Sequence, residues 1–451
     1  MSQTVRRQLI KISNTLRDAN DLLGKLFHGV ADEEMIALLT DCQNCAITMG
    51  NKIETVYGSG LKSIHALENY CESIYQISQN LDSLPECMEI YEHTKEQLLE
   101  VQRGIEEIPD KKEIAFMPYK ASMWDSLESV YLAAREDENC EAYVVPIPYF
   151  DRKADKTLGE MHYEGDEYPA NILIANWEKY NFEERLPDVI YIHNAYDDSN
   201  LVTCVHPRFF SSNLKKYTEK LVYIPYFVLE EIDFSDQIKI DAMKHFCFLP
   251  GIVNADKVIL QSESMSQIYM NEYAKVVETA GGTIDRKQLE EKFLGTGSPK
   301  FDKVMSTKKE NLEIPEDWLH IIRKPDGSWK KIIFYNTSVT PLLQREERML
   351  EKMKDVFNIF KRCRDEVVLL WRPHPLIKTT IESMRPQLWN AYNQIVKQYK
   401  DEGWGIYDDT PDVDRAVALC DGYYGDPSSI VQLMQKVGKP VMLQDVKILH
   451  K

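Results

Sequence analysis

The chain has 451 residues, of which 43% are hydrophobic, and its formal net charge is −18. Chains longer than roughly 250–300 residues usually divide into domains, so we expect two or three. The acidic balance argues against nucleic acid as a partner, because nucleic acid attracts basic surfaces. No apolar run approaches the roughly 18–20 residues of a membrane span. Without a signal-peptide core at its start, and with nine scattered cysteines, the chain is expected to be cytoplasmic.

Residues 1–108 are predicted to be helical. Apolar residues recur there at spacings of three and four, as in helices that pack against one another. One stripe runs through Val5, Leu9, Ile12, Leu16, Ala19, Leu23 and Leu26. Further helices are expected near 32–54 and 61–81, with Cys42 and Cys45 on a helix face rather than in a zinc site. The pattern predicts a bundle or a pair of helical hairpins that mediates oligomerisation or docking.

The first of these helices is basic. It carries Arg6, Arg7, Lys11, Arg17 and Lys25. Peripheral contact with the inner face of the plasma membrane is one interpretation of this charge. We favour the other interpretation, in which the basic residues form the solvated face of a bundle.

From residue 109 onward, short apolar runs alternate with amphipathic segments. Examples are "DVIYIHNAY" and "KLVYIPYF" in the range 109–305, and "KKIIFYNTS" and "EVVLLWRPHP" in the range 306–451. This alternation predicts parallel sheets covered by helices on both faces. We expect two Rossmann-type α/β domains with these bounds and a cleft between them, which resembles the glycosyltransferase-B (GT-B) plan. The charged segment 151–169 is expected to be a loop, either a lid or an exposed insertion.

The most informative run is Val367–Trp371, which ends in Arg372-Pro373-His374-Pro375. Ligands bind at the carboxyl ends of strands in such sheets, and Asn336 occupies a similar strand end. Arg372 offers a planar fork of donors suited to phosphate, and His374 can donate to a leaving phosphate. The two prolines limit the freedom of this corner. As a strand-end residue, Arg372 is expected to be exposed and to contribute little to stability.

Ser428 and Ser429 stand at the start of an amphipathic segment that is predicted to be a helix. The unpaired amides at a helix start and its dipole favour an anion. An ordinary N-cap is the structural alternative for such a pair of serines. Together with Arg372 and His374, the serines predict a phosphate site.

The residues from about 295 to 445 resemble the CDP-glycerol glycerophosphotransferase family, the teichoic acid primases and polymerases of Gram-positive bacteria. That family has a strand that ends in Arg-x-His-Pro, matched here by Arg372, His374 and Pro375. Its later Asp-x-Ser-Ser and Lys-Pro elements are matched by Asp426, Ser428, Ser429, Lys439 and Pro440. Its interdomain Gly-x-Pro-Arg-x-Asp element and its strand-end Pro-Thr are matched by Gly297, Pro299, Lys300, Asp302 and Thr337.

The resemblance implies a transferase that moves a glycerophosphoryl or related alditol-phosphate group from a CDP-activated donor, such as CDP-glycerol. The implied acceptor is a hydroxyl of a glycan, a lipid-linked molecule or a polymer of the cell envelope, and CMP leaves. The implied catalytic residues are His193 and His374. The implied donor-binding residues are Arg372, Ser428, Ser429, Asp426, Thr337, Gln432 and Lys300. Gln432 is expected to bind ribose, because Leu433 stands where the family more often has an acidic residue.

His193 follows the run "DVIYI" at a place comparable to the family's Trp-His-Gly, without the Trp and the Gly. It is the expected general base, with His206 in reserve. Asp197 or Asp198 either orients His193 or caps the next helix. No acidic cluster is placed to hold a metal between phosphates, so neither a metal nor a cofactor is expected.

Two other functions stay open at this point. One is a GT-B glycosyltransferase that uses a nucleotide sugar, and the other is a catalytically weak binding module in envelope polymer assembly. The sequence does not decide between glycerol and ribitol. It stops soon after "KPVMLQDV", so we expect either a trimmed chain or an unusual closure of the cleft.

Overall fold

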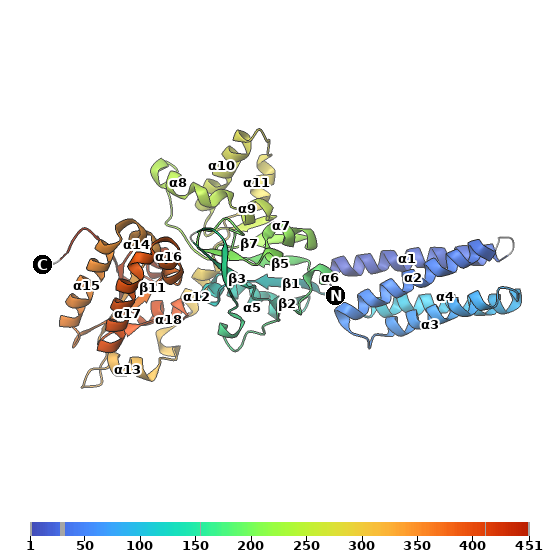
Figure 1. The fold of residues 1–451 in the computed structure, drawn as a ribbon, viewed down its shortest axis with the longest axis horizontal. Helices are drawn as coiled ribbons and strands as arrows, with labels where there is room; N and C mark the ends of the chain where they lie inside the picture. Colours follow the sequence, from blue (N-terminus) through green and yellow to red (C-terminus); the bar gives the residue numbers. More distant parts are fainter. Residues whose placement is uncertain (1, 28–31, 154, 411, 450–451) are drawn as a thin grey trace.

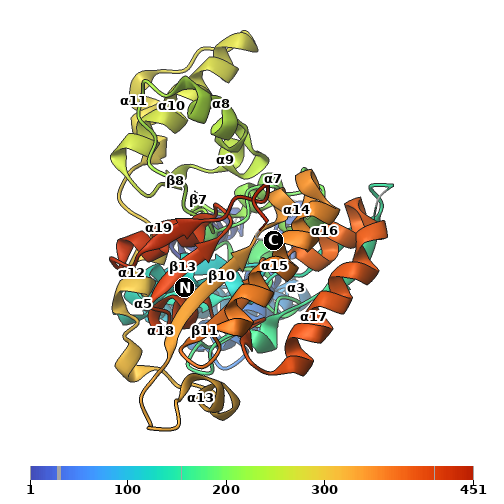
Figure 2. The same ribbon diagram turned by 90° about the vertical axis from the view of Figure 1, so that its left-hand side faces the viewer.

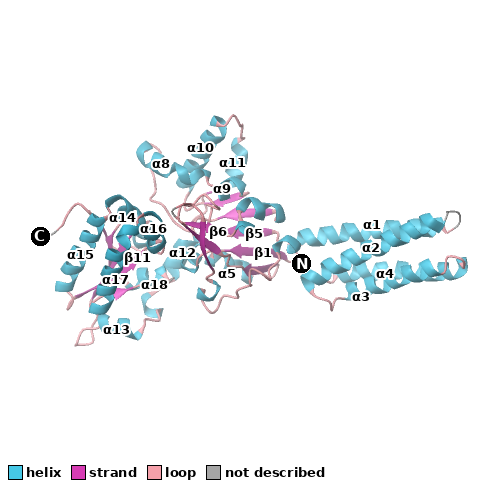
Figure 3. Ribbon diagram, in the orientation of Figure 1, coloured by secondary structure: helices cyan, strands magenta, loops and turns pink. Residues whose placement is uncertain are grey.

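The computed structural model describes residues 2–27, 32–153, 155–410 and 412–449. A helical bundle comes first, and two α/β domains follow in chain order (Figures 1 and 3). The bundle projects from one end of the first α/β domain, and the second α/β domain lies at the opposite end (Figure 1). Within the described ranges, no helix is both long enough and apolar enough to cross a membrane. The predicted α/β fold with a helical N-terminal region is confirmed.

Four long helices form the bundle. Their bounds are Gln3–Leu26 (α1), Asp32–Tyr57 (α2), Lys62–Gln79 (α3) and Leu84–Glu106 (α4). The apolar stripes face inward, where Leu9, Cys42 and Tyr70 are almost completely buried. Burying a large apolar side chain contributes roughly 1.5–3 kcal/mol, so this core stabilises the bundle well beyond helix propensity. The Ser2 hydroxyl oxygen caps α1 by accepting a hydrogen bond from the Val5 amide.

The bundle is attached to the first α/β domain at the buried carboxylate of Asp188. This carboxylate accepts hydrogen bonds from the amides of Gln3, at 2.9 Å, and Thr4, at 3.3 Å. Both amides belong to the first turn of α1, where unpaired N–H groups and the helix dipole favour an anion. The Asp188 carboxylate also accepts a hydrogen bond from the Glu113 amide at 2.8 Å. One side chain therefore joins the start of α1 to the amino ends of two sheet strands.

The first α/β domain contains a parallel sheet of six strands in the order β2-β1-β5-β7-β8-β9. The strands are Lys112–Met117 (β1), Cys140–Val144 (β2), Val189–Ile192 (β5), Lys220–Tyr223 (β7), Lys257–Ile259 (β8) and Phe293–Leu294 (β9). The helices around it are Glu128–Glu136 (α5), Phe182–Arg185 (α6), Ser211–Leu214 (α7), Gln237–Met243 (α8), Pro250–Asn254 (α9), Glu263–Thr279 (α10) and Arg286–Lys292 (α11). The strands are nearly continuous apolar runs because helices cover both faces.

A small antiparallel sheet extends this domain toward the cleft. Its order is β4-β3-β6, with strands Tyr149–Arg152 (β3), Leu158–His162 (β4) and Thr203–Val205 (β6). The segment 151–169, expected to be a loop, therefore contains the end of β3 and all of β4. The prediction missed this hairpin because the strands are short and carry glycine and charged residues, which weaken the strand pattern. The hairpin leads directly to Glu164 and Glu167 at the cleft.

The second α/β domain has a parallel five-stranded sheet in the order β12-β11-β10-β13-β14. Its strands are Lys331–Thr337 (β10), Val367–Pro373 (β11), Ile406–Tyr407 (β12), Gly422–Gly425 (β13) and Val441–Leu443 (β14). Its helices are Glu316–Ile322 (α13), Val339–Arg345 (α14), Glu347–Arg362 (α15), Ile377–Met384 (α16), Trp389–Glu402 (α17), Val413–Leu419 (α18) and Ser429–Lys436 (α19). Figure 2 shows α15 and α17 on one side of this sheet and α18 and α19 on the other.

Helix α12, Pro299–Ser306, connects the two α/β domains and packs on both. The buried Lys300 amine forms an ion pair with Asp125 of the first domain. One helical turn later, Lys303 contacts Glu128 at 2.6 Å. These charged contacts fix α12 beside the cleft. The proposed division at 108 and 305 stays a prediction.

We expect the Asp188→Ala variant to lose about 2–4 kcal/mol of unfolding free energy, because three amides lose their acceptor. Amide hydrogen exchange should accelerate at Gln3, Thr4 and Glu113 in this variant. Asp18, exposed on α1, provides the control, since Asp18→Ala should change stability by less than about 0.5 kcal/mol. Equal exchange rates in both variants would show that Asp188 does not attach the bundle.

Candidate functional site

Arg372 ends β11 inside the second domain rather than on its surface. Its side chain is 5% exposed, and its Nη1 lies 2.7 Å from Oδ2 of Asp408, which follows β12. The Asp408 carboxylate is fully buried and also accepts hydrogen bonds from the Thr410 amide and hydroxyl. The expectation of an exposed Arg372 is therefore wrong. Removing Arg372 leaves the buried Asp408 carboxylate without its closest cation, and breaking a buried pair costs about 3–5 kcal/mol.

His374 is half-buried beside Arg372. Its Nδ1 accepts a hydrogen bond from the Leu376 amide at 3.1 Å, and its backbone N–H donates to the Thr337 carbonyl at 2.9 Å. With Nδ1 as acceptor, the neutral ring carries its proton on Nε2. Burial, followed by the cations Lys120 and Arg372, lowers the pKa of His374 to about 4. At neutral pH this ring is an uncharged hydrogen-bond donor.

Ser428 is the N-cap of α19, which is the structural alternative for this serine. Its hydroxyl oxygen accepts a hydrogen bond from the Ile430 amide at 3.3 Å and another from the Asn336 side chain at 3.0 Å. Within the described residues, the Ser429 hydroxyl makes no hydrogen bond and stays available to a ligand. Gly425 allows the end of β13 to pack closely against Asn336 at the end of β10. A Cβ atom at position 425 would lie 2.3 Å from the Asn336 carbonyl oxygen.

A small cavity of about 100 Å³ lies between these groups and the first domain. Its polar wall consists of Ser122, Lys300, Asn336, Arg372, His374, Ser428 and Ser429. Among the described residues, two cations and no carboxylate line it. The cavity is suited to an anion the size of a phosphate. It is smaller than the roughly 300–1,000 Å³ of typical small-molecule sites, so a whole nucleotide requires the domains to move apart.

Three predicted donor-binding residues do not line this cavity. The Thr337 hydroxyl oxygen accepts a hydrogen bond from the Trp371 indole at 3.1 Å. Asp426 accepts hydrogen bonds from the Ser338 amide, at 2.6 Å, and from the Gln444 side chain. Gln432 lies on α19, beyond the cavity lining. Thr337 and Asp426 therefore support the strand ends that present the site, rather than reaching into it.

His193 is completely buried in the first domain. Its Nε2 accepts a hydrogen bond from the Tyr119 amide at 3.0 Å, while Nδ1 lies 3.2 Å from the Met123 carbonyl oxygen and 3.0 Å from the Ser126 hydroxyl. Burial lowers the pKa of His193 to about 3. Both ring nitrogens are occupied by the protein, so this geometry argues against His193 as a base for an acceptor hydroxyl.

The reserve candidate and the neighbouring aspartates have structural contacts too. His206 lies among aromatic rings, stacked on Phe150 at 5.8 Å between ring centroids. Asp197 accepts hydrogen bonds from the amide and hydroxyl of Ser211, the first residue of α7. Asp197 thus caps the next helix, which is one of the two predicted alternatives. The Asp198 carbonyl accepts a hydrogen bond from Arg152.

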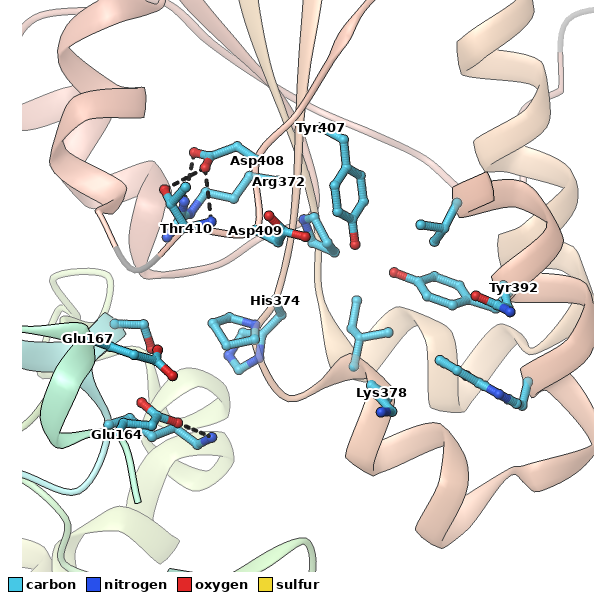
Figure 4. A pocket seen from close by; sticks show the side chains of 18 residues that line it. Glu164, Glu167, Arg372, His374, Lys378, Tyr392, Tyr407, Asp408, Asp409 and Thr410 are labelled. Carbon is cyan, nitrogen blue, oxygen red and sulfur yellow. Dashed lines mark hydrogen bonds and ion pairs between the residues drawn. The ribbon is translucent and has the colours of Figure 1, made fainter. Parts of the chain in front are cut away.

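A second, larger cavity of about 340 Å³ adjoins the first along Arg372–Pro375 (Figure 4). Most residues that line it were not among the predicted site residues, including Lys120, Glu164, Glu167, Trp389, Tyr392, Tyr407 and Asp408. Lys120 was detectable, because it follows β1 at the carboxyl end of the sheet. Its amine lies 2.6 Å from the Tyr149 hydroxyl and 3.4 Å from Glu164. Burial lowers the pKa of Lys120.

Two parallel α/β domains that face each other across a cleft, with polar groups at the strand ends, define a GT-B fold. No family model matches the sequence, and no curated protein matches it. The chain is similar to several solved structures, three of which follow.

One similar structure is the S. aureus MnaA–UDP co-structure, with 12% identity, a TM-score of 0.42, and coverage of 74% of this chain and 78% of that one. Another is Methanocaldococcus jannaschii UDP-GlcNAc 2-epimerase in complex with UDP-GlcNAc and UDP. It shows 10% identity, a TM-score of 0.43, and coverage of 73% and 83%. A third, the trehalose 6-phosphate synthase from Burkholderia multivorans, shows 12% identity, a TM-score of 0.34, and coverage of 74% and 83%.

We expect His193 to make the protein sensitive to acid. The unfolded chain binds a proton at this histidine below about pH 6.5, whereas the folded chain binds one only near pH 3. Stability from the neutral ring is therefore complete above pH 6.5 and is lost as the pH falls. Between pH 7 and 5 the loss is about 2 kcal/mol.

Chemical denaturation at several pH values tests this expectation. The His193→Asn variant should lose about 2 kcal/mol less than the parent protein over that interval. His65→Asn, at an exposed position on α3, should follow the parent profile. A His193→Asn profile parallel to that of the parent would mean that His193 is not held neutral by the fold.

Proposed function

We propose that this chain is a GT-B-type transferase that takes a group from a nucleoside-diphosphate-linked donor. The observation that supports the proposal is the small cavity, which Arg372, His374, Lys300 and the start of α19 line together. The carboxylates that pair with the two cations, Asp408 and Asp125, lie outside its lining. A diphosphate carries charge that such a set of donors binds well. If His374 were only a core residue and Ser428 only an N-cap, the donor groups of the two domains would have no reason to line the same cavity.

Each of these groups has a distinct task in the proposed reaction. The Arg372 guanidinium is held by Asp408 through Nη1, and no other hydrogen bond ties it to a described residue. Its remaining N–H groups can therefore donate to phosphate oxygens. The His374 Nε2–H and the Ser429 hydroxyl add uncharged donors. Donors fixed before the reaction stabilise the charge that develops on the leaving phosphate.

The identity of the donor separates two forms of the proposal. The resemblance to the CDP-glycerol glycerophosphotransferases favours a CDP-alditol, with attack at phosphorus and departure of CMP. The alternative is a nucleotide sugar, with attack at the anomeric carbon and departure of a nucleoside diphosphate. Both forms place the diphosphate at Arg372–Pro375. A third possibility, a binding module in polymer assembly, predicts nucleotide binding without turnover.

Isothermal titration of the full-length protein with CDP, UDP and GDP tests the donor site. We expect at least one nucleotide to bind, and we expect Ser429→Ala and His374→Ala each to weaken that binding by about tenfold to a hundredfold. Each variant removes one hydrogen bond to a charged oxygen, worth about 1.5–3 kcal/mol. The Ser429→Ala variant should melt near the temperature of the parent, because the Ser429 hydroxyl has no partner in the described protein.

Ser306→Ala, at an exposed position at the end of α12, is the matched control and should bind as the parent does. Incubation with radiolabelled CDP-glycerol, against UDP- and GDP-sugars, then identifies the donor. If none of the three nucleotides binds, or if binding is indifferent to both site variants, the proposed donor site is wrong.

A further inference from the structure

The larger cavity is not explained by a diphosphate. It lies on the other side of Arg372–Pro375 from the small cavity, between the first domain and helices α16 and α17. Its volume of about 340 Å³ falls within the range of small-molecule sites. It is therefore large enough for a ligand of its own.

The charges of the two cavities differ. The larger one is lined by Glu164, Glu167, Asp408 and Asp409, against three cations. Three of these carboxylates already have ion pairs, which are Glu164 with Lys120, Asp408 with Arg372, and Asp409 with Lys400. Glu167 is the exception: in the described protein its carboxylate has no ion pair and no hydrogen bond. Lys378, which also lines the cavity, has no ion pair in the described protein either. The lining therefore offers both acceptors and donors to the hydroxyl groups of a ligand.

Aromatic side chains form the opposite wall. Trp389 and Tyr392 lie on α17 with their ring centroids 6.2 Å apart and their planes inclined by 28°. Figure 4 shows the Tyr392 hydroxyl directed into the cavity, with Glu164 and Glu167 on the far side of His374. Trp389 is half-buried, so part of its ring remains open to a ligand.

An aromatic face opposite a free carboxylate fits a sugar ring. The C–H groups of a sugar ring carry slight positive charge and pack against the negative face of an aromatic ring. Its hydroxyl groups donate hydrogen bonds to carboxylates and accept them from Tyr or Lys. Burial raises the pKa of Glu167, and the neighbouring Glu164 acts in the same direction. This indicates a carboxylate that gains from a hydrogen-bond donor.

From this juxtaposition we infer that the larger cavity binds a carbohydrate, the acceptor of the proposed transfer. The half-buried Trp389 packs against the sugar ring. Tyr392, which is only 3% exposed, offers its hydroxyl, and Glu167 accepts a hydrogen bond from a hydroxyl of the sugar. The role of this carbohydrate as acceptor rests on the proposed function, whereas carbohydrate binding by the larger cavity does not. Because Arg372–Pro375 line both cavities, a sugar hydroxyl in the larger one would meet the donor beside His374.

The test is binding of the full-length protein to an array of immobilised glucose, galactose and N-acetylglucosamine oligosaccharides. The parent protein should bind at least one of them. Trp389→Ala and Glu167→Ala should each weaken that binding about tenfold, while the affinity for CDP, UDP or GDP stays within twofold. Trp329→Ala and Asp166→Ala, at exposed positions outside the cavity, are the matched controls and should bind as the parent does.

The outcomes separate this inference from the proposed function. If the parent protein binds a nucleotide but none of the oligosaccharides, the carbohydrate site is wrong and the donor site is still supported. A Trp389→Ala variant that loses nucleotide affinity instead shows that the larger cavity holds the nucleobase, which also overturns the inference. Oligosaccharide binding that depends on Trp389 and Glu167, without any nucleotide binding, supports the carbohydrate site and refutes the donor.

Discussion

The buried ion pair between Arg372 and Asp408 is the interaction on which the cleft depends. It joins the carboxyl ends of β11 and β12, and the corner that follows Arg372 separates the two cavities. Arg415 approaches the same carboxylate at 3.7 Å. A buried pair of this kind adds little net stability, yet breaking it is costly. The ion pair serves to orient the Arg372 side chain, because it fixes the direction of the remaining guanidinium N–H groups.

Much of the architecture follows from local signals in the sequence. The alternation of apolar strands with amphipathic helices predicted both parallel sheets, because burial on two faces requires apolar residues on each strand. The Arg372 and His374 corner and the start of α19 at Ser428 were also predictable, since strand ends and N-caps have short-range signatures. These residues do converge on one cavity.

The rest of the site depends on contacts between distant residues. His193 stands at a strand end, but its surroundings are set by Tyr119, Met123 and Ser126, about 70 residues earlier. No pattern around His193 discloses that both ring nitrogens are taken. Glu167 follows a hairpin whose strands are too short and too polar to predict. Its position in the lining of the larger cavity therefore could not be predicted either. Burial and pairing of polar groups are tertiary properties, which periodicity does not report.

The bundle and the cleft occupy opposite edges of the first domain. Asp188 joins α1 to the amino ends of the strands, whereas both cavities lie at carboxyl ends. Helix α2 has 26 residues, which corresponds to about 39 Å at 1.5 Å per residue. A partner bound at the end of the bundle far from Asp188 would therefore lie away from both cavities. It would change the reaction rate through the effective concentration of the substrates that it holds near the cleft, without contacting the site.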